Sequence, residues 1–278
     1  MNVQTIEYNS SSAPEEFTKS LKDTGFAVLT NHPIKFNLIQ KVYHEWEAFF
    51  KSKQKHSYLF DEIKQDGYFP FLSENAKDSQ FKDLKEFYHI YPKGRFPKEL
   101  STNTDELYNE LSKLAEILLS WVEENIPSKI SENFSIPLSK MIHESPKNLL
   151  RIIHYPPLKG DEVPEMVRAA AHGDINLLTV LVAGTQPGLQ VQDLNGNWHD
   201  VSCNSGTIAV NTGDMLQMAS NDFLPSTIHR VINPKGEIPN QSRLSMPLFL
   251  HPHDDVKLSE RYSAIEYLNE RLQEIGLK

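Results

Sequence analysis

Two histidines and an aspartate in the second half of the chain have the types and spacing of metal ligands. His172 and Asp174 lie two residues apart in the segment AHGD. Side chains at positions i and i+2 of a strand point to the same face, so an imidazole and a carboxylate can converge on one ion. His229, in the predicted strand STIHRVIN, supplies a third ligand. Two histidines and one carboxylate on one side of a metal form the facial arrangement of non-haem Fe(II) oxygenases.

The pair His172 and Asp174 carries little weight when it is taken alone. The chain has 11 histidines, so a match to His-x-Asp is expected by chance about as often as not. A second match, His253 and Asp255, follows Pro252 in a polar stretch beyond the last predicted strand. Nothing there fixes two side chains on one face, so we interpret this second match as a solvated loop.

An arginine downstream makes a functional site more plausible than a chance match. On the predicted strand SRLSMPLFL, Arg243 and Ser245 share a face, and the alternate residues are apolar. A guanidinium inside a β-barrel is costly unless an anion meets it. Arginine grips a carboxylate with two parallel hydrogen bonds, and the serine can donate to the same group. The pattern predicts a dicarboxylate that chelates the metal at one end. The alternative is an arginine paired with a local Asp or Glu.

The overall charge and the single cysteine restrict the class of protein. The formal net charge is −9 with no offsetting basic run, which disfavours nucleic acids and anionic membrane surfaces as partners. No stretch approaches the run of about 18 apolar residues that spans a bilayer. Cys203 stands alone, so no intrachain disulfide can form, and the N-terminus lacks the pattern of a signal peptide. We therefore expect a cytoplasmic protein.

The two halves of the chain predict different secondary structure. Apolar residues recur at helical spacing over residues 36–50, 105–125 and 263–275. From residue 148 the chain instead has short segments rich in β-branched residues, separated by Gly, Pro and Asn, which is typical of an antiparallel sandwich or barrel. Asn195-Gly196 predicts a type I′ hairpin turn. The expected fold class is α+β, with a β core wrapped by helices mainly from the N-terminal half.

The motifs together resemble the isopenicillin N synthase-like family of 2-oxoglutarate- and Fe(II)-dependent dioxygenases. The resemblance covers nearly the whole chain, and the ordered set of His-x-Asp, distal His and Arg-x-Ser is its most specific part. It rests on the segments GFAVLTNHPI, DLKEFYHI, LLRIIHYPP, AHGDINLLTVLVAGTQPGLQVQDLNGNW, VNTGDMLQMASNDFLPSTIHRVINP and RLSMPLFLHP.

This resemblance implies a distorted double-stranded β-helix, or jelly-roll, flanked by helices. The chain then forms one catalytic unit. A mainly helical region spans residues 1–147, the Fe(II) and 2-oxoglutarate core spans residues 148–252, and a loop and helix follow at residues 253–278.

The resemblance also implies roles for individual residues. It assigns iron ligation to His172, Asp174 and His229. A second set of residues matches positions that bind 2-oxoglutarate or substrate: Arg243 and Ser245 for the distal carboxylate, Tyr155 as an assisting tyrosine, and Phe249 in the substrate pocket. Tyr155 and Phe249 can equally be core residues. Tyr68 and Phe69 lie in a region where relatives often contact substrate, although loops also bury aromatic residues as anchors.

Three positions depart from the family pattern without touching the expected ligands. Gly173 stands where the family usually has Thr, and Pro33 replaces a usual Gly. Ile153 replaces a frequent Asn, so one polar contact near the metal is expected to be missing.

The expected activity is oxidation of a small-molecule C–H bond, by hydroxylation or desaturation, with 2-oxoglutarate and O2 converted to succinate and CO2. Two alternatives remain. One is an Fe(II) oxidase that does not consume 2-oxoglutarate, like isopenicillin N synthase, and the other is a jelly-roll binding module whose metal is structural or absent. Substrate identity and oligomeric state cannot be inferred from the pattern.

Overall fold

Two β-sheets that pack against each other form the centre of the molecule. The computed structural model describes residues 1–75, 80–235 and 240–274. The larger sheet has eight strands in the order β1 (Gln4–Glu7), β2 (Phe26–Thr30), β10 (Ile208–Thr212), β7 (Leu178–Val182), β12 (Arg243–Leu250), β5 (Leu149–Tyr155), β4 (Glu86–Ile90) and β3 (Gly67–Phe69). The smaller sheet has the order β6 (Ala169–His172), β11 (His229–Val231), β8 (Leu189–Gln192) and β9 (Trp198–Asp200).

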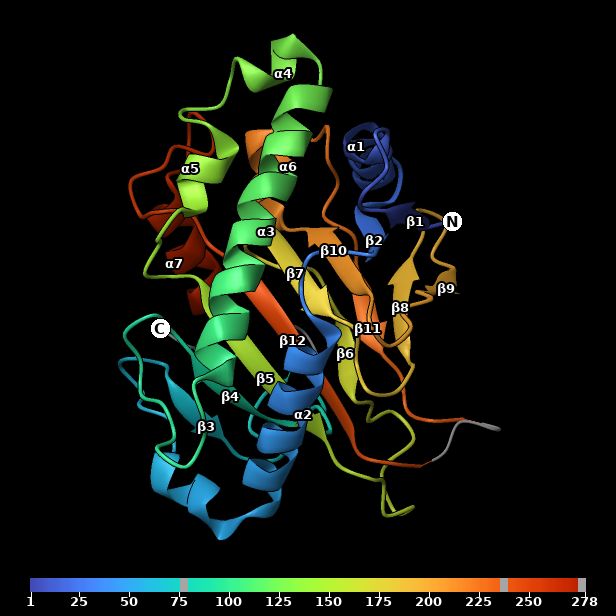
Figure 1. The fold of residues 1–278 in the computed structure, drawn as a ribbon, viewed down its shortest axis with the longest axis vertical. Helices are drawn as coiled ribbons and strands as arrows, with labels where there is room; N and C mark the ends of the chain where they lie inside the picture. The colour runs from blue at the N-terminus through green and yellow to red at the C-terminus, as the bar shows by residue number, and fades with distance from the viewer. Residues whose placement is uncertain (76–79, 236–239, 275–278) are drawn as a thin grey trace.

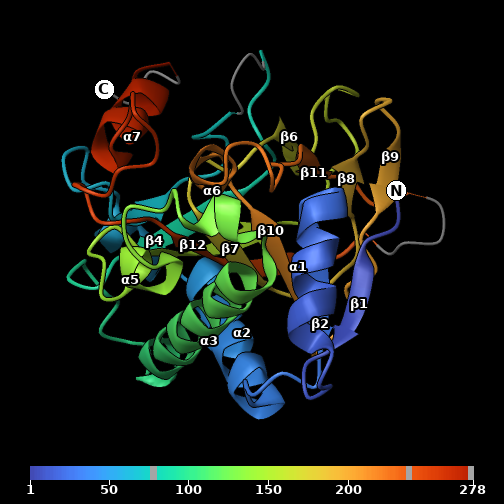
Figure 2. The same ribbon diagram turned by 90° about the horizontal axis from the view of Figure 1, so that it is seen from above.

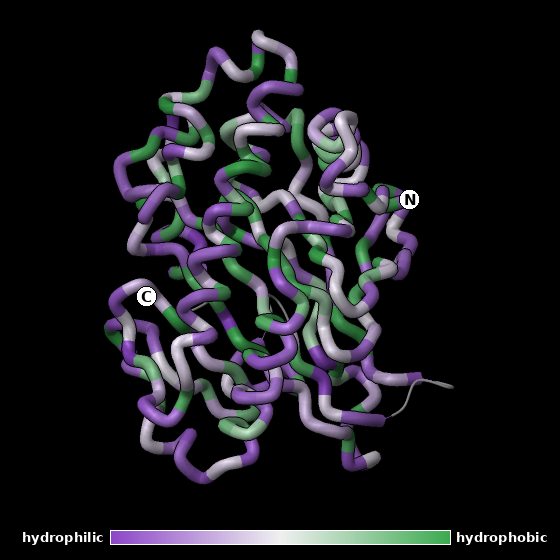
Figure 3. The backbone as a smooth tube through the Cα atoms, in the orientation of Figure 1, coloured by the Kyte–Doolittle hydropathy of each residue, from purple (hydrophilic) through white to green (hydrophobic). Residues whose placement is uncertain are grey.

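Three helices cover the outer face of the larger sheet (Figures 1 and 2): α1 (Ala13–Thr24), α2 (Phe36–Lys51) and α3 (Asn103–Asn125). Each carries a buried apolar stripe, and hydrophilic and hydrophobic residues alternate along these helices (Figure 3). The shorter helices are η1 (Lys53–Tyr58), α4 (Ser128–Ser131), α5 (Leu138–Ile142), α6 (Asp214–Ala219) and α7 (Ala264–Glu274). None of the helices in the described ranges combines the length and apolarity needed to cross a membrane.

Alternate side chains of β12 enter two different hydrophobic cores. Leu244, Met246 and Leu248 belong to the core between the larger sheet and its helices. Arg243 and Ser245 point the other way, toward the space between the sheets, which is otherwise lined by apolar residues of both. The larger sheet is therefore covered on both faces, and its inner face can hold polar groups away from solvent.

The fold predicted from the sequence is confirmed. The helices expected at residues 36–50 and 105–125 are α2 and α3, and the one expected at 263–275 is α7, with Ile275 outside the described residues. The short β-branched segments form β5, β7, β8, β10, β11 and β12, and the whole is a double-stranded β-helix. Four strands from the first 147 residues extend the larger sheet at both edges. The segment GFAVLTNHPI, which predicts a short buried strand, forms β2, whereas β1, β3 and β4 were not predicted.

The hairpin between β8 and β9 forms, but the expected type I′ turn is wrong. That turn needs a positive φ at both central residues, whereas only Gly196, with φ of 84°, has one. The Asp193 carboxylate instead accepts the N–H groups of Asn195 and Asn197, each at 2.9 Å, and the Gly196 N–H donates to the Asp193 carbonyl. This side-chain cap stabilises a longer loop than the Asn-Gly pair alone suggests.

Candidate metal centre

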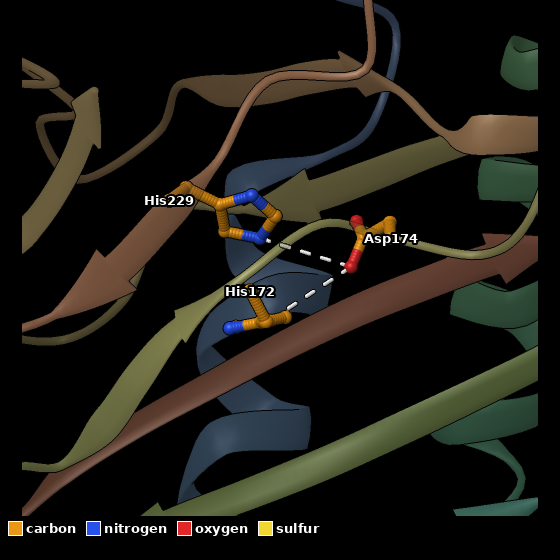
Figure 4. Close-up of side chains that lie close together, drawn as sticks. All are labelled: His172, Asp174 and His229. Atoms are coloured by element: carbon orange, nitrogen blue, oxygen red, sulfur yellow. Dashed lines mark ion pairs between the residues drawn. The ribbon is translucent and has the colours of Figure 1, made fainter. Parts of the chain in front are cut away.

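The three predicted metal ligands meet between the two sheets. His172 ends β6 and is paired directly with His229, which begins β11, while Asp174 lies in the loop that follows β6. One ligand atom from each of the three lies within 4.8 Å of the others (Figure 4). The ring centroids of the two histidines are 4.4 Å apart. Sequence spacing therefore identified three side chains that the fold brings together.

Backbone carbonyls orient both imidazoles. The Nδ1 atom of His172 lies 2.7 Å from the Ala170 carbonyl oxygen, and that of His229 lies 3.1 Å from the Thr227 carbonyl oxygen. Because a carbonyl oxygen only accepts, each Nδ1 carries a proton, which leaves Nε2 as the nitrogen that can bind a metal. The Nε2 atoms lie 3.9 and 3.7 Å from the same Asp174 oxygen, too far for a hydrogen bond. This spacing suits an ion between the three groups.

Hydrogen bonds hold one oxygen of Asp174 and leave the other facing the histidines. Oδ2 accepts from the Thr179 hydroxyl at 2.6 Å and from the Asn211 amide at 2.8 Å. Burial alone would raise the pKa of Asp174, but the two histidines and these hydrogen bonds outweigh it and lower the pKa. Burial, and then the neighbouring His229, lower the pKa of His172 to about 4, so its imidazole is neutral near pH 7. Two imidazole nitrogens and a carboxylate oxygen are a donor set that fits Fe(II).

A close backbone approach places the segment that leads to His229. Gly25 ends α1 with a φ of 70°, a conformation that favours glycine. A Cβ atom there would lie 2.3 Å from the Thr227 hydroxyl and 2.6 Å from the Pro225 carbonyl oxygen. The Thr227 hydroxyl also donates to the Thr24 carbonyl at 2.9 Å. The end of α1 thus anchors the chain two residues before the ligand.

Arg243 is buried on the inner face of β12 with no acidic partner among the described residues. Its Nε donates to the Gln186 carbonyl at 2.9 Å, its guanidinium carbon lies 5.1 Å from the Tyr155 ring centre, and Nη1 has no hydrogen-bond partner. A Cβ at Gly184 would lie 2.6 Å from Nη2, so a side chain there would displace the guanidinium from this position. Ser245, 3% exposed, follows two residues along the same face. The alternative predicted from the sequence, an ion pair between Arg243 and a local Asp or Glu, does not form among the described residues.

The predicted aromatic residues occupy two different faces. Phe69 stacks on Phe87 at 4.5 Å in the core between the sheets, and Phe249 is partly exposed on the inner face of β12. Tyr68 lies on the opposite face of β3, where its ring packs near Phe50 of α2 and its hydroxyl donates to Glu86. A substrate contact by Tyr68 does not fit this position, because adjacent residues of a strand point to opposite faces.

The second His-x-Asp match lies in a loop, as expected. His253 hydrogen-bonds through Nε2 to the His143 carbonyl oxygen at 2.8 Å, while Asp255 is exposed. Among the described residues, His172, Asp174 and His229 are the only group of three side chains placed to hold a metal ion.

Sequence reasoning did not single out the residues that position Asp174. Thr179 is a polar residue in the otherwise apolar β7, and Asn211 is its register partner in β10, so both lie on the inner face. A polar residue at an inward position of a buried strand was the available signal. Asp214, which follows Gly213, also donates its backbone N–H to the Asp174 carbonyl at 2.8 Å.

Comparison with known proteins identifies the family. Residues 146–252 match the 2OG-Fe(II) oxygenase superfamily, and residues 6–111 match the N-terminal region described as non-haem dioxygenase in morphine synthesis. A proposed oxygenase of Shewanella oneidensis is 50% identical over the full length of both chains, with a TM-score of 0.90. A proposed 2OG-Fe(II) oxygenase family protein of Caulobacter crescentus is 28% identical over 98% of this chain and 99% of its own, with a TM-score of 0.82.

A curated relative agrees with these structures. Clavatol oxidase of Penicillium crustosum is 25% identical over 93% of this chain and 85% of its own length. The chain belongs to the 2-oxoglutarate- and Fe(II)-dependent oxygenases, and it is an oxidoreductase that uses Fe(II), 2-oxoglutarate and O2.

Proposed function

We propose that His172, Asp174 and His229 hold the Fe(II) of this oxygenase, and that Arg243 and Ser245 bind the distal carboxylate of 2-oxoglutarate. The observation that carries the proposal is the His-Asp-His group on one side of the inner space, in which Asp174 and His229 are buried, together with a guanidinium on the facing sheet that has no acidic partner among the described residues. Tyr155 borders the same guanidinium and completes the co-substrate pocket. Residues 148–252 then form the catalytic core within a single unit.

Each residue in this arrangement has a physical task. An iron held by these ligands would supply the oxidising chemistry, in which 2-oxoglutarate, O2 and a substrate C–H bond would give succinate, CO2 and either a hydroxylated product or a desaturated product and water. The two imidazoles offer Nε2 lone pairs because their Nδ1 protons are engaged by carbonyls. Arg243 fixes the co-substrate by its far end, which orients the keto acid toward the metal ligands. The apolar lining between the sheets keeps bulk water out.

The substrate is proposed to be a small molecule that enters beside the partly exposed Phe249. Phe69 lies on the same inner side of the sheet and is proposed as a second contact. Thr179 is the register partner of Phe249 and hydrogen-bonds Asp174, so Phe249 lies one strand away from the metal centre. Tyr68 is not part of this proposed pocket.

Succinate release tests the proposal. Purified protein with Fe(II), ascorbate and 2-oxoglutarate is expected to release succinate above background, and more strongly when a library of small metabolites supplies the substrate. The Asp174→Ala variant should lose this release, because it removes a proposed ligand. Asp255→Ala, in the second His-x-Asp match, is the matched control and should behave as wild type.

Two results would contradict the proposal. Oxygen uptake with no succinate would favour an oxidase that does not consume 2-oxoglutarate. Tight Zn(II) binding with no oxygen uptake under any condition would favour a non-catalytic metal-binding module.

A further inference from the structure

A second arginine is buried near the proposed co-substrate pocket without an acid. Arg168, directly before β6, is 1% exposed, less than Arg243. Its Nη2 donates to the Gln241 carbonyl at 2.7 Å, while its Nε has no hydrogen-bond partner. No ion pair joins it to any acid in the described ranges. Burial, and then the charge of Arg243, lower the pKa of Arg168 to about 10, so it remains a cation at neutral pH.

The two arginines share one aromatic neighbour and one hydrogen-bonded frame. The guanidinium carbons of Arg168 and Arg243 lie 6.0 and 5.1 Å from the centre of the Tyr155 ring. The Gln186 side chain donates to the Gln241 side chain at 3.2 Å, and the backbone carbonyl of Gln186 accepts from Arg243. Since Arg168 donates to the Gln241 carbonyl, a continuous chain of contacts links both guanidiniums.

Two buried cations without a counter-charge are unfavourable in the ligand-free protein. An isolated charge loses its hydration on burial, and a ring contact recovers only part of that loss. One ionised carboxylate has two oxygens and about four lone-pair directions, so it can accept hydrogen bonds from two guanidiniums at once. Each arginine also retains one nitrogen without a partner, Nε of Arg168 and Nη1 of Arg243. A carboxylate that reached both nitrogens would supply the counter-charge that both guanidiniums lack.

We propose that Arg168 is a second binding residue for the distal carboxylate of 2-oxoglutarate, so that the pocket is a two-arginine clamp selective for dicarboxylates. This inference rests on the proposed function, since it concerns the same co-substrate. It differs from a structural role, in which the bond from Arg168 to the Gln241 carbonyl would only fix the loop that leads into β12. The two roles predict different responses to ligands that lack the distal carboxylate.

The test compares two 2-oxo acids of equal chain length. Anaerobic Fe(II)-loaded protein is titrated by calorimetry with 2-oxoglutarate and with 2-oxopentanoate, which has a methyl group in place of the distal carboxylate. Loss of charge-assisted hydrogen bonds in Arg168→Gln should weaken 2-oxoglutarate binding about 10- to 100-fold. Binding of 2-oxopentanoate should change less than about twofold, because it makes no bond to the clamp. Arg168→Lys keeps the charge and should recover part of the 2-oxoglutarate affinity.

A matched control is available on the smaller sheet. Arg230 is partly exposed, stacks over Trp198 and donates to Gln190, so Arg230→Gln should leave both affinities unchanged. Equal weakening for the two acids in Arg168→Gln would show a structural role and overturn the clamp. Unchanged 2-oxoglutarate affinity in both Arg168 variants would overturn it as well. If wild-type protein fails to bind 2-oxoglutarate at all, the proposed function fails together with the clamp.

Discussion

Two groups of buried cations near the space between the two sheets differ in how their charge is balanced. Lys85 is paired with two acids inside the chain, Glu74 at 2.7 Å and Asp83 at 2.8 Å. Arg243 and Arg168 are at least as buried but have no acidic partner among the described residues. In the first group, acids of the same chain balance the buried positive charge. The second group lacks a counter-charge in the described chain, and a bound anion would supply one.

This difference separates structural charges from binding charges. In the complete group, Arg151 also pairs with Glu74 and stacks over Phe87, and Asp83 accepts the N–H of Ala170 in the strand that carries His172. These contacts tie β4 to β6 and support the metal strand without a ligand. Arg243 and Arg168 form no ion pair of this kind among the described residues. Their positions are therefore better explained by binding than by stability.

The largest effect is expected when a balanced cation is removed. Lys85→Met leaves the buried Asp83 carboxylate without its cation, and breaking a buried ion pair from one side costs about 3–5 kcal/mol. We expect the free energy of unfolding in urea to fall by roughly that amount, with 2-oxoglutarate affinity retained. Lys129→Met, at an exposed position, is the control and should unfold as wild type does. An unchanged midpoint for Lys85→Met would refute the structural role of this group.

Removal of an unbalanced cation should have the opposite effect on stability. Arg243→Met removes a buried charge that lacks a counter-ion, so the ligand-free protein should gain about 1 kcal/mol or more. The same variant should bind 2-oxoglutarate about 100-fold more weakly, because two charge-assisted hydrogen bonds are lost. Urea unfolding and calorimetry measure the two quantities. If Arg243→Met lost as much stability as Lys85→Met, the distinction between structural and binding charges would be contradicted.

A smaller effect is expected on the pH dependence of stability. Burial would raise the pKa of Glu74, but Arg151 and Lys85 outweigh it and hold this pKa well below its usual range. A carboxyl with a depressed folded pKa stabilises the protein above its unfolded pKa of about 4.3, and that stability is lost as the pH falls through the folded value. Wild-type stability should therefore decline below about pH 5, and Glu74→Gln should decline less steeply. If the urea midpoints of wild type and Glu74→Gln fell by the same amount between pH 7 and pH 3, this pairing would be contradicted.

Strand periodicity predicted the pairing of His172 with Asp174 and the shared face of Arg243 and Ser245. The alternation along β12 fixes which side chains share a face, and the structure shows the same faces. His172 and Asp174 converge as predicted, although β6 ends at His172 and Asp174 lies in the loop that follows. The partner strand of His229 could not be derived from spacing. It depends on the pairing of β6 with β11, a tertiary contact between segments far apart in the chain.

The features that sequence reasoning missed depend on contacts outside any local pattern. Arg168 precedes a four-residue strand, so no periodicity places it near Tyr155. Tyr68 and Phe69 are adjacent, and only the pairing of β3 with β4 decides which of them faces the metal side. The Asn-Gly turn was overridden because the Asp193 side chain supplied a competing set of hydrogen bonds.

The most direct test of the site is the visible spectrum of the anaerobic protein with Fe(II) and 2-oxoglutarate. Chelation of iron by the keto acid beside His172, Asp174 and His229 should give a weak charge-transfer band. The band should vanish in Asp174→Ala and need a higher 2-oxoglutarate concentration in Arg243→Met. A wild-type protein without the band, or an Asp174→Ala variant that keeps it unchanged, would contradict the site described above.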